Sequence, residues 1–222
     1  MIHTKTYAAP PVDTREILRY AGVRGESAET EALLQTCLAE AAPLLTYQVC
    51  WSVFPLSRSA DAMDLGFART ASASLSKHLG SCQQVLVFAA TTGIALDRLI
   101  HRYNRLSPAR ALLLQAIGTE RIEALCDTFC QEMATQQSVL GGSVTHRFSP
   151  GYGDLPLSLQ QDIFQVLNCH RTIGLTLNES LLMSPSKSVT ALLGLSNSPH
   201  CPETPSGCAA CQKTSCAYRR TT

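Results

Sequence analysis

The chain has 222 residues, of which 45% are hydrophobic and 16% are charged, and its formal net charge is +1. This length and apolar content allow a full core in one domain, and the near-neutral balance gives no basic field to draw the chain to nucleic acid or an anionic membrane. The longest apolar run, residues 85–96, is shorter than the roughly 20 residues that span a bilayer. The N-terminus has no hydrophobic signal-peptide stretch, so we expect a cytoplasmic protein.

The first third of the chain predicts two helices and a strand. Residues 12–22 begin with Asp13 as a helix N-cap and end with Gly22 as a C-cap. Residues 46–56 are rich in aromatic and β-branched residues and predict a strand that ends at Pro55. Between them, residues 27–45 predict a helix with one apolar face, formed by Leu33, Leu34, Cys37, Leu38 and Ala41.

The middle of the chain predicts a buried strand between helices. Residues 72–79 can form a short helix, and residues 84–91 read as a buried strand. Gly93 then starts a helix over residues 94–104. Ser107 and Pro108 start a long helix, since Ser favours the N-cap and Pro the first helical position. Its apolar stripe consists of Leu114, Gly118, Ile122, Leu125, Phe129 and Met133.

Glycines and prolines divide the last part into short elements. Residues 143–148 predict a short strand, and Ser158 caps a helix over residues 159–168. Residues 174–196 alternate like two strands around Pro185. Because strands and helices mix without a regular βαβ repeat, the pattern favours an α+β fold.

The segment HRFSPGYGDLPLSLQ, residues 146–160, holds the most informative loop. Arg147 offers a fixed fork of donors suited to a carboxylate, and Gly151 and Gly153 allow a ligand to approach the backbone. Tyr152 adds a flat ring and a hydroxyl between the two glycines. These residues suit an amino-acid carboxylate and a purine or ribose, but a plain turn with the tyrosine folded over the core fits the same letters.

Two segments in this region carry a family's motifs. RFSPGYGDLPLSLQQDIFQVLN, residues 147–168, has an Arg-x-x-x-Gly-Tyr motif ahead of a helix, and residues 174–195 add an Asn-Glu-Ser segment and a Met-x-Pro turn. With looser similarity over residues 87–100 and 116–127, they resemble the activation domain of cobalamin-dependent methionine synthase, which binds S-adenosyl-L-methionine (AdoMet). The resemblance implies a mixed or antiparallel sheet with flanking helices, and we expect this domain to cover residues 1–195.

The resemblance also implies roles for five residues. Arg147 would hold the AdoMet carboxylate, and Tyr152 would lie along the ligand. The backbone around Ser149 and Gly151 would meet the ligand. Glu123 would face its amino group, although the residue pattern fits a solvated helix glutamate equally well.

The chain also departs from the family's pattern. The usual domain is the last part of a large enzyme, whereas this chain resembles the free-standing, activation-domain-like relatives. After Tyr152 the family has proline, but this sequence has Gly153 and Asp154, which leaves the retention of AdoMet binding open.

Residues 196–222 have three prolines and four of the ten cysteines, and they predict a tail without a core of its own. The cysteines follow the spacing C-x6-C-x2-C-x4-C, in which the C-x2-C pair can chelate one metal from a single turn. Zinc and a [4Fe–4S] cluster both fit four thiolates, and a flexible tail with redox-labile thiols is the alternative. The four predicted ligands are Cys201, Cys208, Cys211 and Cys216.

The six other cysteines are scattered and read as small buried hydrophobic residues. The sequence lacks dinucleotide-binding, phosphate-loop, zinc-protease and serine-hydrolase motifs, which argues against an autonomous hydrolase.

By its resemblance, the chain is expected to be an AdoMet-binding accessory protein that supports reductive reactivation of a cobalamin-dependent methyltransferase such as methionine synthase. Cobalamin would sit on that partner, and flavodoxin or ferredoxin would supply the electron. One alternative is a non-catalytic interaction module with a zinc-binding tail that has lost AdoMet binding. Another, a free methyltransferase acting on small molecules, is weakened by the missing glycine-rich loop of that class.

Overall fold

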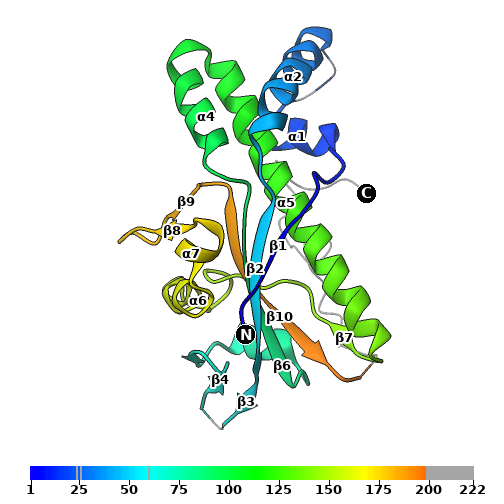
Figure 1. The fold of residues 1–222 in the computed structure, drawn as a ribbon, viewed down its shortest axis with the longest axis vertical. Helices are drawn as coiled ribbons and strands as arrows, with labels where there is room; N and C mark the ends of the chain where they lie inside the picture. The colour runs from blue at the N-terminus through cyan, green and yellow to red at the C-terminus, as the bar shows by residue number, and fades with distance from the viewer. Residues whose placement is uncertain (24, 26, 60, 199–222) are drawn as a thin grey trace.

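The computed structural model describes residues 1–23, 25, 27–59 and 61–198. Its centre is an antiparallel sheet in the order β1-β2-β6-β10-β7 (Figure 1). β6 lies in the middle, paired with β2 on one side and β10 on the other. These five strands are β1 (His3–Thr6), β2 (Gln48–Pro55), β6 (Gln84–Thr91), β7 (Ser143–Val144) and β10 (Ser188–Ser196).

One face of the sheet is covered by α5 (Pro108–Val139), the long helix that crosses the molecule in Figure 1. The predicted apolar stripe of this helix is buried, and the C-terminal half of the stripe packs on alternate side chains of the strands. Phe129 lies against both Phe88 and Trp51, with ring centroids 4.8 and 5.3 Å away. This contact fixes the rotation of α5 over the sheet, and therefore which of its residues face away from the core.

The other face of the sheet is covered by three short helices. They are α3 (Ala73–Leu79), α6 (Leu159–Leu167) and α7 (Cys169–Ile173). Their apolar side chains, such as Leu79 and Ile163, pack on Val87 and Leu192 of the strands. The sheet is thus buried on both faces, as its uniformly apolar central strand predicts.

A third apolar cluster lies beyond the end of the sheet. There the first half of α5 packs against α1 (Thr14–Tyr20), α2 (Ala28–Ala41) and α4 (Ala95–Leu106), as Figure 1 shows at its top. The short 3-10 turn Ala42–Leu44 leads from α2 into β2. The predicted N-cap of the first helix is confirmed, because the Asp13 carboxylate accepts hydrogen bonds from the amides of Arg15 and Glu16.

Several small elements differ from the sequence expectation. The expected strand 143–148 is regular only over β7, and Phe148 returns to the sheet as an isolated bridge to Leu192. Residues 174–196 form a small hairpin, β8 (Thr176–Leu177) and β9 (Met183–Ser184), followed by the long β10. Residue patterns did not predict β1, α7 or the three-stranded sheet made of β3 (Ser57–Arg58), β4 (Met63–Asp64) and β5 (Arg69–Thr70).

The predicted α+β class, with an antiparallel sheet and flanking helices, is confirmed. The scattered cysteines are all free, and all are fully buried except Cys130, which is partly exposed. Among the described helices, none is long and apolar enough to cross a membrane. The domain boundary at residue 195 stays a prediction, and β10 extends one residue past it.

Candidate functional site

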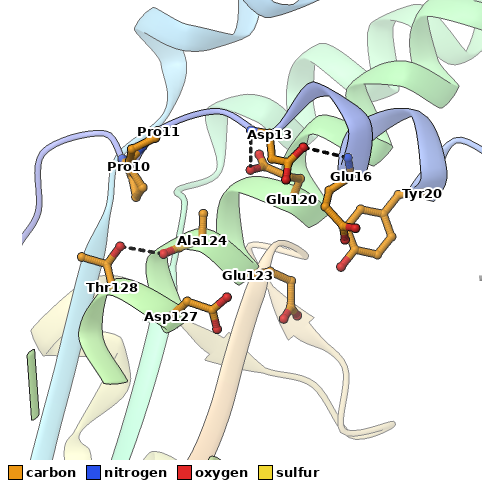
Figure 2. Close-up of a pocket in the computed structure, with 10 residues that line it drawn as sticks. All are labelled: Pro10, Pro11, Asp13, Glu16, Tyr20, Glu120, Glu123, Ala124, Asp127 and Thr128. Carbon is orange, nitrogen blue, oxygen red and sulfur yellow. Dashed lines mark hydrogen bonds between the residues drawn. The ribbon is translucent and has the colours of Figure 1, made fainter. Parts of the chain in front are cut away.

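Two carboxylates of α5 and one guanidinium form the centre of the site. Glu123 and Asp127 are one helical turn apart and project from the same side of α5 (Figure 2). Arg147, in the loop after β7, reaches them: its Nη2 contacts Glu123 Oε2 and lies 3.3 Å from Asp127 Oδ1. The guanidinium therefore bridges the loop to the helix.

The other terminal nitrogen of Arg147 has no such partner. Nη1 is buried, and the described residues offer it no hydrogen-bond acceptor. A buried donor without an acceptor is costly, so most such groups in proteins are satisfied by a neighbour, a water molecule or a ligand. The Arg147 side chain as a whole is 25% exposed, which leaves it reachable from the solvent.

Arg147 lies in a groove of about 690 Å³ between α5 and the loop. The groove is lined by both carboxylates, by a mixture of polar and apolar side chains and by Tyr152. Its lining comprises Glu123, Asp127, Cys130, Gln131, Ala134, Val144, Thr145, His146, Arg147, Ser149, Tyr152 and Val189. Charged groups combined with polar and apolar side chains are typical of sites for small amphipathic ligands.

The loop itself is a series of tight turns that needs its glycines. The Gly151 amide donates to the Leu155 carbonyl, and the Leu155 amide donates to the Tyr152 carbonyl. Gly151 and Gly153 have φ values of +91° and +56°, where residues with a Cβ are strained. Tyr152 is held at the rim, 62% exposed and edge-on to Phe148. Tyr152 is therefore not folded into the core.

Asp154 fastens the end of this loop to the start of α3. Its carboxylate accepts hydrogen bonds from the Ser72 hydroxyl at 2.5 Å and from the amides of Ala73 and Ser74 at 2.8 and 3.1 Å. The Ser72 bond and these amide bonds hold the pKa of Asp154 well below its usual range. The Gly153-Asp154 departure from the family's motif is thus an anchor in this chain.

His78 fastens the start of the loop to the same helix. Its Nε2 lies 2.6 Å from the carbonyl oxygen of His146, and since a carbonyl can only accept, the nitrogen donates. Burial lowers the pKa of His78, so the ring is neutral near pH 7. Both ends of the segment that carries Arg147 are therefore bonded to α3.

Cys130 supplies the sulfur on the groove wall. Burial raises the pKa of its thiol to about 11, and its neighbour Cys126 is fully buried. Cys130 therefore stays protonated at neutral pH and behaves as a small apolar side chain rather than as a nucleophile.

A second pocket, of about 450 Å³, shares Glu123 and Asp127 with the groove, and Figure 2 shows the residues that line it. Its other wall is the segment that runs from Pro10 to α1. Arg121 donates to the carbonyls of Pro10 and Pro11, both at 2.6 Å, while Glu120 accepts from the Asp13 amide at 3.1 Å. Glu120 and Arg121 are bonded to each other, and this buried pair clamps the N-terminal segment onto α5.

Four of the five residues predicted to bind AdoMet line one groove: Glu123, Arg147, Ser149 and Tyr152. Gly151 shapes the turn beneath them. Their role in binding a ligand stays a prediction. The predicted metal ligands Cys201, Cys208, Cys211 and Cys216 lie outside the described residues, and within the described ranges no cluster of three or more His, Cys, Asp or Glu side chains could hold a metal ion.

Sequence reasoning missed Asp127 and the two anchors of the loop. The spacing of Asp127 from Glu123, four residues along one helix, was a usable sign that both share a face. The His78 anchor joins residues 68 positions apart and the Asp154 anchor joins residues 82 positions apart, and no local sequence pattern predicts such contacts.

Comparison with known proteins identifies the family to which the chain belongs. The chain resembles the solved structure described as "Crystal Structure of the MetH Reactivation Domain bound to AdoHcy", with a TM-score of 0.63 and 15% identity, over 92% of this chain and 80% of that one. No curated protein matches it significantly. A family model described as "Vitamin B12 dependent methionine synthase, activation domain" matches residues 75–200, more than half of the 222 residues, including α5 and the Arg147 loop. The chain therefore belongs to the activation-domain family of vitamin B12-dependent methionine synthase.

Proposed function

We propose that the chain binds AdoMet in the groove beside Arg147 and serves the reductive reactivation of a cobalamin-dependent methyltransferase. The observations that carry this proposal are the position of Arg147 in the lining of the groove and its buried Nη1, which has no hydrogen-bond partner among the described residues. A carboxylate is the acceptor that best matches a guanidinium.

The rest of the groove suits the rest of the ligand. With its carboxylate on Arg147, the ammonium group of AdoMet would come near Glu123, which lies against the same guanidinium. The nucleoside would extend along the rest of the groove, where Val189 and the ring of Tyr152 offer stacking and packing surface. The structurally similar reactivation domain is described as bound to AdoHcy, which is AdoMet without its methyl group.

In the proposed reaction the chain positions AdoMet and leaves the chemistry to the partner's cobalt. In this role the partner methyltransferase's cobalamin, reduced by a donor such as flavodoxin or ferredoxin, would supply the nucleophile that accepts the AdoMet methyl group. The carbon–sulfur bond of AdoMet would break, and AdoHcy would leave with the electron pair of that bond. No residue of the groove becomes a nucleophile, and the contribution of Arg147 and Glu123 is orientation of the donor.

The cysteine tail is a separate part of the proposal. Cys201, Cys208, Cys211 and Cys216 are the proposed ligands of zinc or of a [4Fe–4S] cluster, which in the second case would relay the electron. Metal analysis of anaerobically purified protein, together with its visible absorption, distinguishes the two metals from a metal-free tail.

Calorimetric titration of AdoMet tests the binding site. Arg147→Ala removes the charged fork and should weaken binding about tenfold to a hundredfold. Arg147→Lys keeps the positive charge without the bidentate geometry, so its AdoMet affinity should lie between those of the native protein and Arg147→Ala. Arg171→Ala, at an exposed position of α7 over the opposite face of the sheet, should bind as the native protein does. Absence of binding to the native, folded protein would reject the proposal.

A further inference from the structure

The groove is lined by one more carboxylate than guanidinium group. Among the residues that line it, Glu123 and Asp127 are negative, Arg147 is positive, and His146 is the remaining group that can carry charge near neutral pH. One guanidinium thus serves two carboxylates, and the groove has a net formal charge of −1 with His146 neutral. A ligand of net charge +1 would balance it.

The two methyl-transfer ligands differ in this charge. AdoMet carries a carboxylate, an ammonium group and a sulfonium centre, for a net charge of +1. Its demethylated product AdoHcy has a neutral thioether in place of the sulfonium, for a net charge of zero. Arg147 can match the carboxylate and Glu123 the ammonium group in both ligands, which leaves Asp127 with a cationic counterpart in AdoMet alone.

Of the two carboxylates, Asp127 is the better placed to pair with the sulfonium. It lies at the longer distance from Arg147, 3.3 Å between Oδ1 and Nη2, and its side chain is 68% exposed, whereas that of Glu123 is 35% exposed. It also borders both the groove and the second pocket, and if it turns toward a cation in the groove, Arg147 keeps its contact with Glu123.

On these grounds we propose that Asp127 is a specificity-determining residue, which makes the groove prefer a sulfonium ligand to the corresponding neutral thioether. The proposal rests on the proposed function, since it concerns the same ligand site. Its consequence is release of the spent product: AdoHcy, having lost the charge, is held less tightly than the incoming methyl donor.

The size of the preference follows from the exposure of Asp127. Ion pairs at exposed positions are weak, so Asp127 should contribute about 1.5- to 5-fold to the ratio of AdoHcy and AdoMet dissociation constants. This ratio should shrink at high ionic strength, because salt screens exposed charges. Effects that act through Arg147 cancel in the ratio, since both ligands have the same carboxylate and ammonium group.

The test is calorimetric titration of both ligands into the full chain and three variants. Asp127→Asn should bring the ratio of dissociation constants close to one, and Asp127→Glu should restore the preference for AdoMet. The matched control is Asp162→Asn, which removes an exposed carboxylate of α6 outside the groove and should leave the ratio unchanged.

The outcomes separate this inference from the proposed function. If both ligands bind and Asp127→Asn keeps the native ratio, or weakens both ligands equally, Asp127 does not set the preference, while the binding site stands. If neither ligand binds to the folded native protein, the proposed function fails and the inference fails with it.

Discussion

The Asp154 carboxylate accepts a hydrogen bond from the Ser72 hydroxyl, 82 residues earlier in the chain, and also from the first amides of α3. The same helix holds the other end of the Arg147 segment through His78. Because the loop is bonded at both ends, Arg147 is presented to α5 by a fixed backbone rather than by a free loop. This arrangement makes the loop a ready-made wall of the groove.

Removing the Asp154 anchor should loosen the loop without disturbing the sheet. We expect Asp154→Ala to speed hydrogen exchange of the amides of residues 148–155 and to weaken AdoMet binding, while the amides of β6 keep their protection. Asp162→Ala, another exposed carboxylate removed, serves as the control. Unchanged exchange in the loop would mean that its own turns suffice to hold it.

A side chain at Gly153 should destabilise the fold more than a side chain at another glycine with a similar backbone conformation. A Cβ at Gly153 would lie 2.6 Å from Ser74 Oγ, whereas one at Gly141, with φ of +79°, would meet nothing within 4 Å. Gly141→Ala should therefore cost about 1 kcal/mol for the backbone conformation alone. Gly153→Ala should cost more in urea unfolding, because α3 and the loop must also separate. Equal costs would show that the contact with Ser74 relaxes freely.

The buried Glu120–Arg121 pair should be a major source of stability for the N-terminal segment. Arg121 and Glu120 are 2% and 5% exposed, so removing the arginine leaves a buried carboxylate without its cation. Arg121→Ala should lower the unfolding free energy by about 3–5 kcal/mol. Arg98→Ala, on the exposed side of α4, should change it by less than about 0.5 kcal/mol. A small effect of Arg121→Ala would indicate that water replaces the clamp.

Helix starts can be predicted from this sequence more accurately than the composition of the site. Asp13 and the Ser107-Pro108 pair predict helix starts by local chemistry, and a helix starts at each of them in the structure. By contrast, β1 is a short polar edge strand that exists because it pairs with β2, and its letters carry no apolar pattern.

The composition of the groove depends in the same way on tertiary structure. Arg147 could be picked out as an anion-binding residue from its own motif. That it meets Glu123 and Asp127, 24 and 20 residues away on a different element, follows from how α5 is rotated over the sheet. Such pairings are set by core packing, and periodicity shows only that the two acids share a face.

His78 should make stability depend on pH below about 6.5. Burial lowers its pKa in the folded state, so the unfolded chain binds the proton more readily as the pH falls through 6.5. The contribution is full above that pH and decreases below it. Urea unfolding between about pH 5 and 8 should show this slope, and His78→Gln, which keeps a donor for the His146 carbonyl, should flatten it.

The depressed pKa of Asp154 acts in a different range. Its contribution is present above the ordinary value of 3.8 and is lost only in stronger acid, so it leaves the His78 range undisturbed. A slope between pH 5 and 6.5 that persists in His78→Gln would assign the effect to another group.

A crystal structure of the full chain with AdoMet would show whether this groove holds the ligand by its carboxylate. We predict that the ligand carboxylate lies within hydrogen-bonding distance of Arg147 Nη1, its ammonium group beside Glu123, and its nucleoside along Tyr152 and Val189. A ligand bound elsewhere, with Arg147 contacting no part of it, would rule out this binding mode.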